Sequence, residues 1–362
     1  MCYSRVMTLQ YVDHAEDPAA WAASLGVSAT ACELLLASDF VDLHCDLETS
    51  VRLFGLRPQR HHGVAERVSW GFGHTDYPRM REAALTGVVY DIATNPLRPA
   101  GNRLATTLRN IAAAEERIAE HPGELALVRD HAGYVAAREA GLLAMWISLL
   151  GGNALSADLA VLDGPLGEQL HRITLIHLTG SDLGGTSSPV GRDEGLTPLG
   201  HRFIEHCNYN RILVDLAHAG RRTFWDALGA HSESLPPIVS HTGVSAIHAH
   251  WHNVDDDQIR AIAERGGVVG IMYQSAVLAP ARRPCARAAI IDHLQHVVDL
   301  VGEDHAAIGT GYDGAVVPPR DLADITHHPL LVQDMLDRGF TPGRVGKILG
   351  GNYLRVVQSI RP

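Results

Sequence analysis

Cysteine is scarce in this sequence, long apolar runs are missing, and basic residues are outnumbered by acidic ones. The five cysteines are scattered, odd in number and without a CxxC pair, which excludes a disulfide framework and indicates a reducing compartment. No apolar run reaches the roughly 18–20 residues that a membrane span requires, and the first residues contain no apolar signal-peptide segment. We therefore expect a cytoplasmic protein with no membrane partner.

The shortage of basic residues limits the partners further. There are 30 Lys and Arg residues against 41 Asp and Glu residues, which gives a net charge of −11. Binding to a nucleic-acid backbone needs a basic face, so nucleic acid is excluded as the main partner, and a small molecule or short peptide is expected. Histidine is frequent, at 22 copies, and several histidines end apolar runs, where an unpaired polar group would cost free energy.

Eight short apolar runs alternate with helical segments along the chain. This pattern predicts an α/β fold with a parallel sheet covered by helices, and eight units favour a (β/α)8 TIM barrel. An open doubly wound sheet is the alternative, but no GxGxxG follows the first run. The runs cover residues 39–46, 86–92, 142–149, 172–178, 211–218, 237–241, 268–273 and 306–314.

The domain organisation follows from these runs. Residues 1–38 are expected to form a helical N-terminal extension, and residues 39–362 a single barrel domain with helices at its C-terminal end. Residues 49–80 are expected to form a long loop, and loops of that length in a compact domain are more often functional than idle.

Histidine and aspartate residues stand at the predicted strand ends. His44 and Asp46 are two residues apart at the end of the first run, so their side chains point to the same side. His177, His218 and His241 lie at the ends of the fourth, fifth and sixth runs. In a TIM barrel these C-terminal ends form one rim that carries the active site. Imidazole and carboxylate together suit zinc or another first-row divalent metal, so a metal site is predicted at this rim.

Ordered motifs around these residues resemble a known family. The chain resembles the membrane (renal) dipeptidase family, the M19-type metallopeptidases of the amidohydrolase-like barrels, from about residue 39 to residue 358. The resemblance implies a zinc hydrolase with two metal ions that cuts dipeptides, and it suggests a homodimer. The motifs include Asp42-Leu43-His44-Cys45-Asp46, Val214-Asp215-Leu216-Ala217-His218, Ile238-Val239-Ser240-His241 and Tyr312-Asp313-Gly314.

The resemblance also implies roles for single residues. It assigns His44 and Asp46 to one metal and His218 and His241 to the other, and it makes His177 the histidine that faces the substrate. We further expect His252 and Tyr273 to contact the substrate.

Three positions depart from the family pattern. Leu150 stands where the family has a glutamate that bridges the two metals, and Gly311 stands where it has an acidic ligand after the eighth strand. His252 stands where the family has an arginine that grips the substrate carboxylate. Without an anion between them, two divalent cations a few ångströms apart repel each other strongly. The departures therefore predict a reduced metal centre.

Four predicted ligands remain, namely His44, Asp46, His218 and His241. Such a set is enough for one metal with an open coordination position. Zinc is the expected metal, and iron is the alternative because the set contains a subset of two histidines and one carboxylate, the ligand type of non-heme iron sites. With the bridging glutamate missing, the general base is left open between Asp313 and Glu48, and we predict His177 and Asp313 as the catalytic side chains.

The sequence therefore predicts a metal-dependent hydrolase that acts on an amide bond of a small, modified substrate. The missing arginine argues against a free dipeptide. Two alternatives stay open: a metalloenzyme of this fold that carries out a redox or lyase step, and an inert relative that has kept the scaffold.

Overall fold

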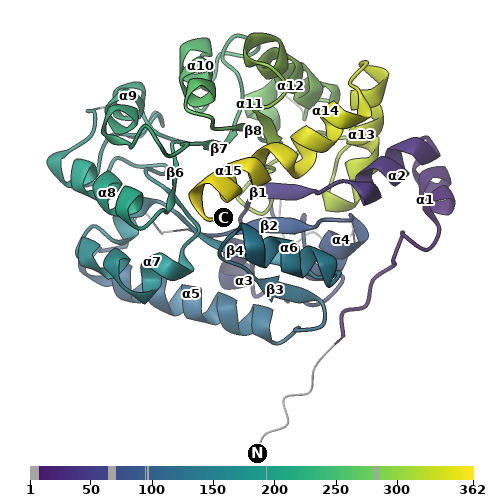
Figure 1. The fold of residues 1–362 in the computed structure, drawn as a ribbon, viewed down its shortest axis with the longest axis horizontal. Coiled ribbons are helices and arrows are strands. Elements are labelled where there is room, and N and C mark those ends of the chain that lie inside the picture. Colours follow the sequence, from purple (N-terminus) through teal and green to yellow (C-terminus); the bar gives the residue numbers. More distant parts are fainter. Residues whose placement is uncertain (1–7, 64–70, 94, 96–97, 193, 281–283) are drawn as a thin grey trace, which may run out of the picture.

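The protein is a barrel of parallel strands surrounded by helices (Figure 1). The computed structural model describes residues 8–63, 71–93, 95, 98–192, 194–280 and 284–362. Five strands follow one another around the barrel in the order β1-β2-β4-β5-β6, and three more in the order β7-β8-β9. The strands are β1 Val41–Cys45, β2 Gly87–Ala93, β3 Leu125–Leu127, β4 Leu143–Leu150, β5 Arg172–Thr174, β6 Leu213–Asp215, β7 Val239–Thr242, β8 Val269–Ile271 and β9 Ala306–Ile308.

Two isolated bridges join these two groups of strands into a closed barrel. Cys45 pairs with Tyr312 where β1 meets the segment after β9, and Asp215 pairs with Ile238 where β6 meets β7. The prediction of an α/β fold with a TIM barrel is thus confirmed. The strand β3 was not predicted, and it pairs with the first residues of β4 outside the ring. Several strands are also shorter than predicted, because regular pairing stops before the polar residues of the rim.

Helices cover the outer face of the barrel, and side-chain caps fix where many of them begin. Asp255 and Gln258 form a capping box at the start of α10, and the Thr197 side chain accepts from the Gly200 N–H at the start of α8. The α-helices are α1 Pro18–Leu25, α2 Ala29–Ala37, α3 Leu47–Phe54, α4 Tyr77–Glu82, α5 Arg103–Ala119, α6 His131–Glu139, α7 Pro165–Gln169, α8 Pro198–Tyr209, α9 Arg221–Ala230, α10 Asp256–Glu264, α11 Ser275–Leu278, α12 Ala288–Val301, α13 His328–Asp337, α14 Pro342–Gly346 and α15 Asn352–Ile360.

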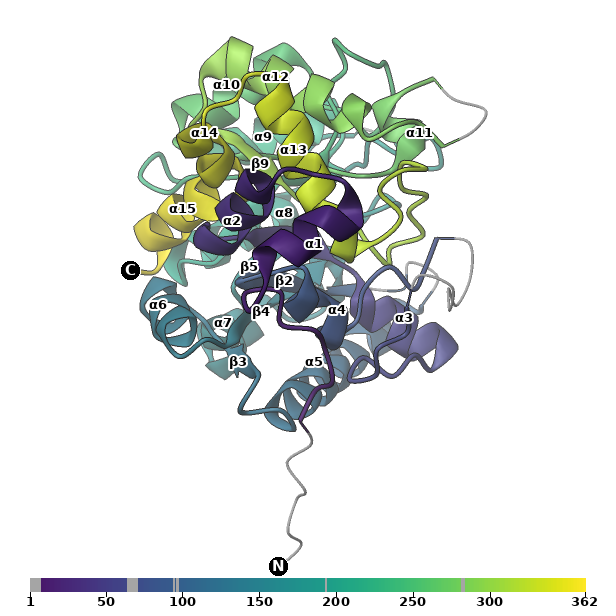
Figure 2. The same cartoon turned by 90° about the vertical axis from the view of Figure 1, so that its right-hand side faces the viewer.

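The N-terminal helices lie beside the C-terminal part of the chain. Both α1 and α2 pack against α13, as Figures 1 and 2 show. The division of the chain at residue 38 stays a prediction. The expected loop at 49–80 is corrected, since α3 and α4 occupy parts of it, and residues 64–70 lie outside the described residues. Within the described ranges, no helix is long and apolar enough to cross a membrane.

The barrel interior has an apolar layer and a polar layer. Val89 and Trp146 belong to an apolar cluster that the buried face of α15 closes at one end of the barrel. Asp91 and Ser148 lie two residues further along the same strands, and both are buried polar residues. They face the same interior as Val89 and Trp146, because side chains two apart share a face. The polar layer therefore lies directly beneath the rim, where it can hold the side chains of a functional site.

Candidate metal centre

Side chains from several strand ends meet in one cavity of about 280 Å³ at the rim, called here the first cavity. His44 belongs to β1 and Asp46 follows it, while His177, His218 and His241 come from the ends of the β5, β6 and β7 segments. His218 has a positive φ of 62°, so its backbone turns sharply just after the strand. The predicted strand-end residues therefore lie together around one space.

His44 is held between two carboxylates. Its Nδ1 lies 2.8 Å from Oδ2 of Asp91, and its Nε2 lies 3.0 Å from Oδ2 of Asp46. Burial by itself lowers the pKa of His44, but the carboxylates of Asp91 and Asp46 outweigh this effect and raise the pKa to about 10. Both ring nitrogens of His44 therefore face carboxylate oxygens, which favour its protonated form.

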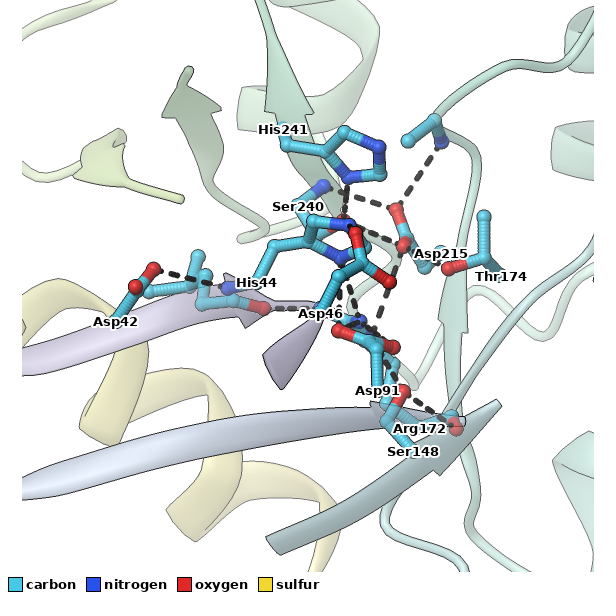
Figure 3. A network of polar contacts seen from close by, with 12 residues as sticks. Asp42, His44, Asp46, Asp91, Ser148, Arg172, Thr174, Asp215, Ser240 and His241 are labelled. Atoms are coloured by element: carbon cyan, nitrogen blue, oxygen red, sulfur yellow. Dashed lines mark hydrogen bonds and ion pairs between the residues drawn. The ribbon is translucent and has the colours of Figure 1, made fainter. Parts of the chain in front are cut away.

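Arg172 anchors this pair from below (Figure 3). Its side chain is fully buried, and Nη2 donates to both oxygens of Asp91, at 2.6 and 2.7 Å. Its Nε donates to Oγ of Ser148 at 3.0 Å, and Nη1 donates to the backbone carbonyl of Leu43. Burial raises the pKa of Asp91, whereas Arg172 and His44 lower it below its ordinary value overall. Asp91 is thus a carboxylate that fixes the orientation of His44.

A second arm of the same network reaches His241. Nε of Arg172 lies 3.6 Å from Oδ2 of Asp215, which accepts a hydrogen bond from Oγ of Ser240 at 2.6 Å. Oγ of Ser240 in turn lies 2.7 Å from Nδ1 of His241. These contacts, also drawn in Figure 3, engage Nδ1 of His241, while its Nε2 lies 2.9 Å from Nε2 of His218. One buried guanidinium therefore supports ligand-type histidines from two different strands.

Three histidines at the rim have ligand atoms close enough for one metal ion. The side chains of His218, His241 and His252, called here the His triad, each offer one nitrogen, and these nitrogens lie within 4.8 Å of one another. Nδ1 of His218 and both ring nitrogens of His252 are buried without a hydrogen-bond partner. Burying such nitrogens unpaired is costly, so a cation bound at the triad would satisfy nitrogens of His218 or His252 that have no partner in the protein.

Burial keeps the His triad neutral. It lowers the pKa of His252 to about 3, and it lowers the pKa values of His218 and His241 well below the ordinary value, with neighbouring histidines adding to the effect. Neutral imidazole is the form that binds a metal. The His triad and His44 are thus in opposite protonation states at neutral pH.

The ring of His44 is not oriented to share a metal with His241. The two rings are stacked, with centroids 3.6 Å apart and planes within 12° of parallel. A nitrogen lone pair lies in the plane of its ring, so two stacked rings do not direct their lone pairs to one point. The predicted ligand set of His44, Asp46, His218 and His241 therefore divides into two groups. His252, which was predicted to contact substrate, joins the second group.

Apolar side chains lie at or beside the two rim positions where the family pattern has acidic residues. Leu150 is buried and lines the first cavity with an apolar side chain. Gly311 has a φ of +69°, and a Cβ there would lie 3.2 Å from Val316 and 3.3 Å from Met272. An aspartate at this position would be strained, so the backbone itself has adapted to glycine.

Two predicted site residues lie elsewhere. The carboxylate of Asp313 accepts hydrogen bonds from Oγ of Ser50, the N–H of Gly73, and the N–H and Oγ of Thr75, at 2.6–3.0 Å. It is buried outside the lining of the first cavity and holds loops together. The hydroxyl of Tyr273 lies 3.1 Å from Nε2 of His328, also away from the lining.

Glu48, the other predicted base, is engaged as well, because it pairs with Arg117 and accepts from the hydroxyl of Tyr90. His177 does line the first cavity, and its Nδ1 is buried without a partner. Burial lowers the pKa of His177 to about 4, so it is neutral at pH 7 and can donate one N–H.

Comparisons with known proteins agree with this architecture. The chain is 28% identical over 269 residues to a Klebsiella pneumoniae protein described as "Uncharacterized protein in pqqA 5'region", a match that covers 72% of this chain and 98% of that protein. The probable dipeptidase PvdM from Pseudomonas aeruginosa is 16% identical, with a TM-score of 0.81 over 91% of this chain and 97% of that one.

A metallo peptidase from Rhodobacter sphaeroides, liganded with a phosphinate mimic of the dipeptide L-Ala-D-Ala, is 23% identical. Its TM-score is 0.77, over 89% of this chain and 99% of that one. These two structural likenesses establish the fold. The sequence model of the family described as "Membrane dipeptidase (Peptidase family M19)" matches residues 28–361. Because that match spans nearly the whole chain, the protein belongs to the membrane dipeptidase family of M19 metallopeptidases, which are hydrolases.

Proposed function

We propose that this protein is a metal-dependent hydrolase that cleaves an amide bond of a small substrate with a single zinc ion held by the His triad. The observation that carries the proposal is the meeting of three buried histidines whose ligand atoms lie within 4.8 Å of one another. Catalytic zinc sites commonly combine three protein ligands with one open position. In this proposal His252 completes the ligand set in place of the bridging carboxylate that Leu150 replaces.

The chain's own residues support hydrolysis around such a site. A bound zinc ion would activate the attacking water and polarise the amide carbonyl. Among the described residues that line the first cavity, Asp46 is the only carboxylate, and its Oδ1 has no hydrogen-bond partner. Asp46 therefore accepts the proton of the attacking water through Oδ1, while its contact with His44 fixes the other oxygen. His177 donates its ring N–H to the oxyanion.

Asp46 replaces Asp313 as the proposed general base, because the oxygens of Asp313 already accept four hydrogen bonds. His44 becomes a positioning residue for Asp46. Iron as the metal, together with a redox or lyase reaction, is the competing proposal that metal analysis separates from this one. The cytoplasmic location and the homodimer stay predictions.

The test is to strip the protein with a chelator, reload it with zinc, and follow amine release from small amides. We expect hydrolysis that requires zinc and that His252→Ala abolishes. His248→Ala is the matched control, because His248 lies in the same segment of the chain but does not line the first cavity and is not part of the His triad. Activity that survives both the chelator and His252→Ala would contradict the proposal, and one iron per chain without amide hydrolysis would favour the competing one.

A further inference from the structure

A second cavity lies on the other side of the His triad. It has a volume of about 390 Å³ and lies between the loop at residues 186–191, the start of α9 and the turn at residues 251–255. His218, Trp251 and His252 line both cavities. Two histidines of the proposed metal site therefore stand in the wall between two spaces, so a substrate held at the metal has room on both sides.

The loop that forms the second cavity is tied to the site. The hydroxyl of Thr186 donates to the backbone carbonyl of His177 at 2.7 Å and to that of His218 at 3.2 Å. The N–H of Ser187 also donates to the carbonyl of His218, at 2.9 Å. The loop at residues 186–191 is therefore fixed to the strand ends that carry the site histidines.

The two cavities differ in chemistry. The first presents Leu150 and a small apolar cluster of Met272, Val277 and Val316. The second is lined mainly by residues with hydroxyl and amide groups, including Ser187, Ser188 and Gln258. The Oγ atom of Ser187 is buried without a hydrogen-bond partner. An apolar group is thus favoured on one side of the site and a hydrogen-bonding group on the other.

Charge recognition is weak on both sides. Among the described residues of the first cavity there is no lysine or arginine. The one described arginine of the second cavity, Arg221, forms an ion pair with Asp255 and is close to Asp257. His44, whose protonated form is favoured by its two neighbouring carboxylates, is already paired with both of them. A free carboxylate beside the scissile bond would therefore lose its hydration without gaining an unpaired cationic side chain, which is costly. The dipeptide carboxylate is therefore a poor fit.

We infer that the substrate is an uncharged N-acyl amide, with an apolar acyl group in the first cavity and a polar amine-side group in the second. This inference rests on the proposed function. The orientation of the substrate follows from His177, which lines the first cavity and is not part of the second. Because the carbonyl oxygen that His177 must reach belongs to the acyl half, the acyl group lies in the first cavity.

The first experiment measures kcat/KM of the zinc-loaded protein on N-acyl glycinamides with acetyl, butyryl, hexanoyl and phenylacetyl groups. We expect a rise of about fourfold for each added methylene until the cavity is filled, since one buried methylene contributes about 0.8 kcal/mol. Replacing the glycinamide with propylamine, or with glycine and its free carboxylate, is expected to lower kcat/KM at least tenfold. A flat acyl series, or a preference for L-Ala-D-Ala, overturns the inference while leaving the hydrolase proposal standing.

Two blocking variants assign the halves of the substrate to the cavities. Ala276 lines only the first cavity and Ser187 only the second. We expect Ala276→Trp to remove the gain from longer acyl groups and Ser187→Trp to remove the preference for glycinamide over propylamine. The reverse assignment would overturn the proposed direction. Zinc content and thermal unfolding of each variant show that it is folded and metal-bound.

A binding measurement separates this inference from the hydrolase proposal. N-substituted hydroxamates chelate zinc and carry one group on each side, so their affinity for the zinc-loaded protein reports on the cavities without turnover. Tighter binding of phenylacetyl over acetyl, and of a carboxamidomethyl over a propyl group on nitrogen, supports the two-sided site even where no amide is hydrolysed. Equal binding of all four hydroxamates, in a protein that does hydrolyse amides, overturns the substrate inference alone.

Discussion

The two halves of the rim contain similar residues in opposite states. In the half from β1, His44 lies between Asp91 and Asp46, and both of its nitrogens are engaged. In the His triad, several ring nitrogens are buried without partners and burial keeps the rings neutral. The difference comes from neighbouring carboxylates, which hold a proton on His44, whereas the triad has none in its immediate set. Whether a histidine at a strand end is suited to bind a metal or to hold a proton therefore depends on whether carboxylates contact its ring.

The largest effect that this comparison predicts is on turnover when Asp46 is changed. Asp46→Asn should lower kcat by about 10²–10⁴-fold, the range for losing a general base, while zinc content stays near that of the wild type. Steady-state kinetics and metal analysis of the same preparation check both parts. Loss of zinc along with activity would show that Asp46 is a ligand and would erase the distinction between the halves.

Removing one histidine from each half gives the next contrast. His252→Ala should weaken zinc binding by more than about 100-fold, beyond the range for residues that only support a ligand. His44→Ala should keep its zinc affinity within about tenfold, because in this account His44 only supports Asp46. Competition with a chromophoric chelator measures both. Equal losses in the two variants would mean that one metal is shared across the rim.

A smaller effect should follow from Ser240, which links Asp215 to Nδ1 of His241. Ser240→Ala should weaken zinc binding by about 10-fold, at the lower end of the range for outer-shell changes. Ser148→Ala is the matched control, because Ser148 accepts from Nε of Arg172 but has no contact of its own with His241. The absorption spectrum of the cobalt-substituted protein should change in the first variant and not in the second. The opposite pattern would show that the arms are assigned wrongly.

The smallest effect concerns a histidine whose pKa is set mainly by burial. His328 is fully buried, and burial lowers its pKa to about 4. Between about pH 6.5 and pH 4 the unfolded chain thus binds a proton that the folded chain does not, so stability falls as pH falls, by up to about 1.4 kcal/mol per pH unit. His328→Gln should remove that part of the slope in urea unfolding of the metal-free protein. An unchanged slope would show that burial does not set the pKa.

His44 should contribute with the opposite sign. Its pKa is raised, to about 10, so its stabilisation is fully present below about pH 6.5 and is lost as pH rises toward 10. The two histidines, both buried, thus separate the effect of burial from the effect of carboxylates.

Much of the architecture could be predicted from the sequence because apolar runs of strand length alternate with helices throughout. The rim histidines His177, His218 and His241 were found by their place at the ends of those runs. Tyr273 was misplaced because its run was extended past the true end of β8 at Ile271. Side chains in extended chain alternate faces, and Met272 is the neighbour that lines the cavity.

The polar layer and the place of His252 in the His triad were missed for a different reason. Asp91 and Arg172 are charged residues within buried strands, and a buried charge requires a partner. That signal was present, but pairing the two required knowing that β2 and β5 flank β4 in the barrel. His252 lies in a turn rather than at a strand end, and only the alternating His248, His250 and His252 hinted at it. Which histidines converge depends on tertiary structure.

The central claim is that the rim binds one metal, at the His triad, and a proton at His44. The most direct measurement is the metal content of the protein after saturation with zinc and removal of the excess by gel filtration, read by mass spectrometry against protein concentration. We expect one tightly bound zinc per chain in the wild-type protein. This zinc should be retained in His44→Ala and lost in His252→Ala. Two zinc ions per chain, with one lost in His44→Ala, would contradict it.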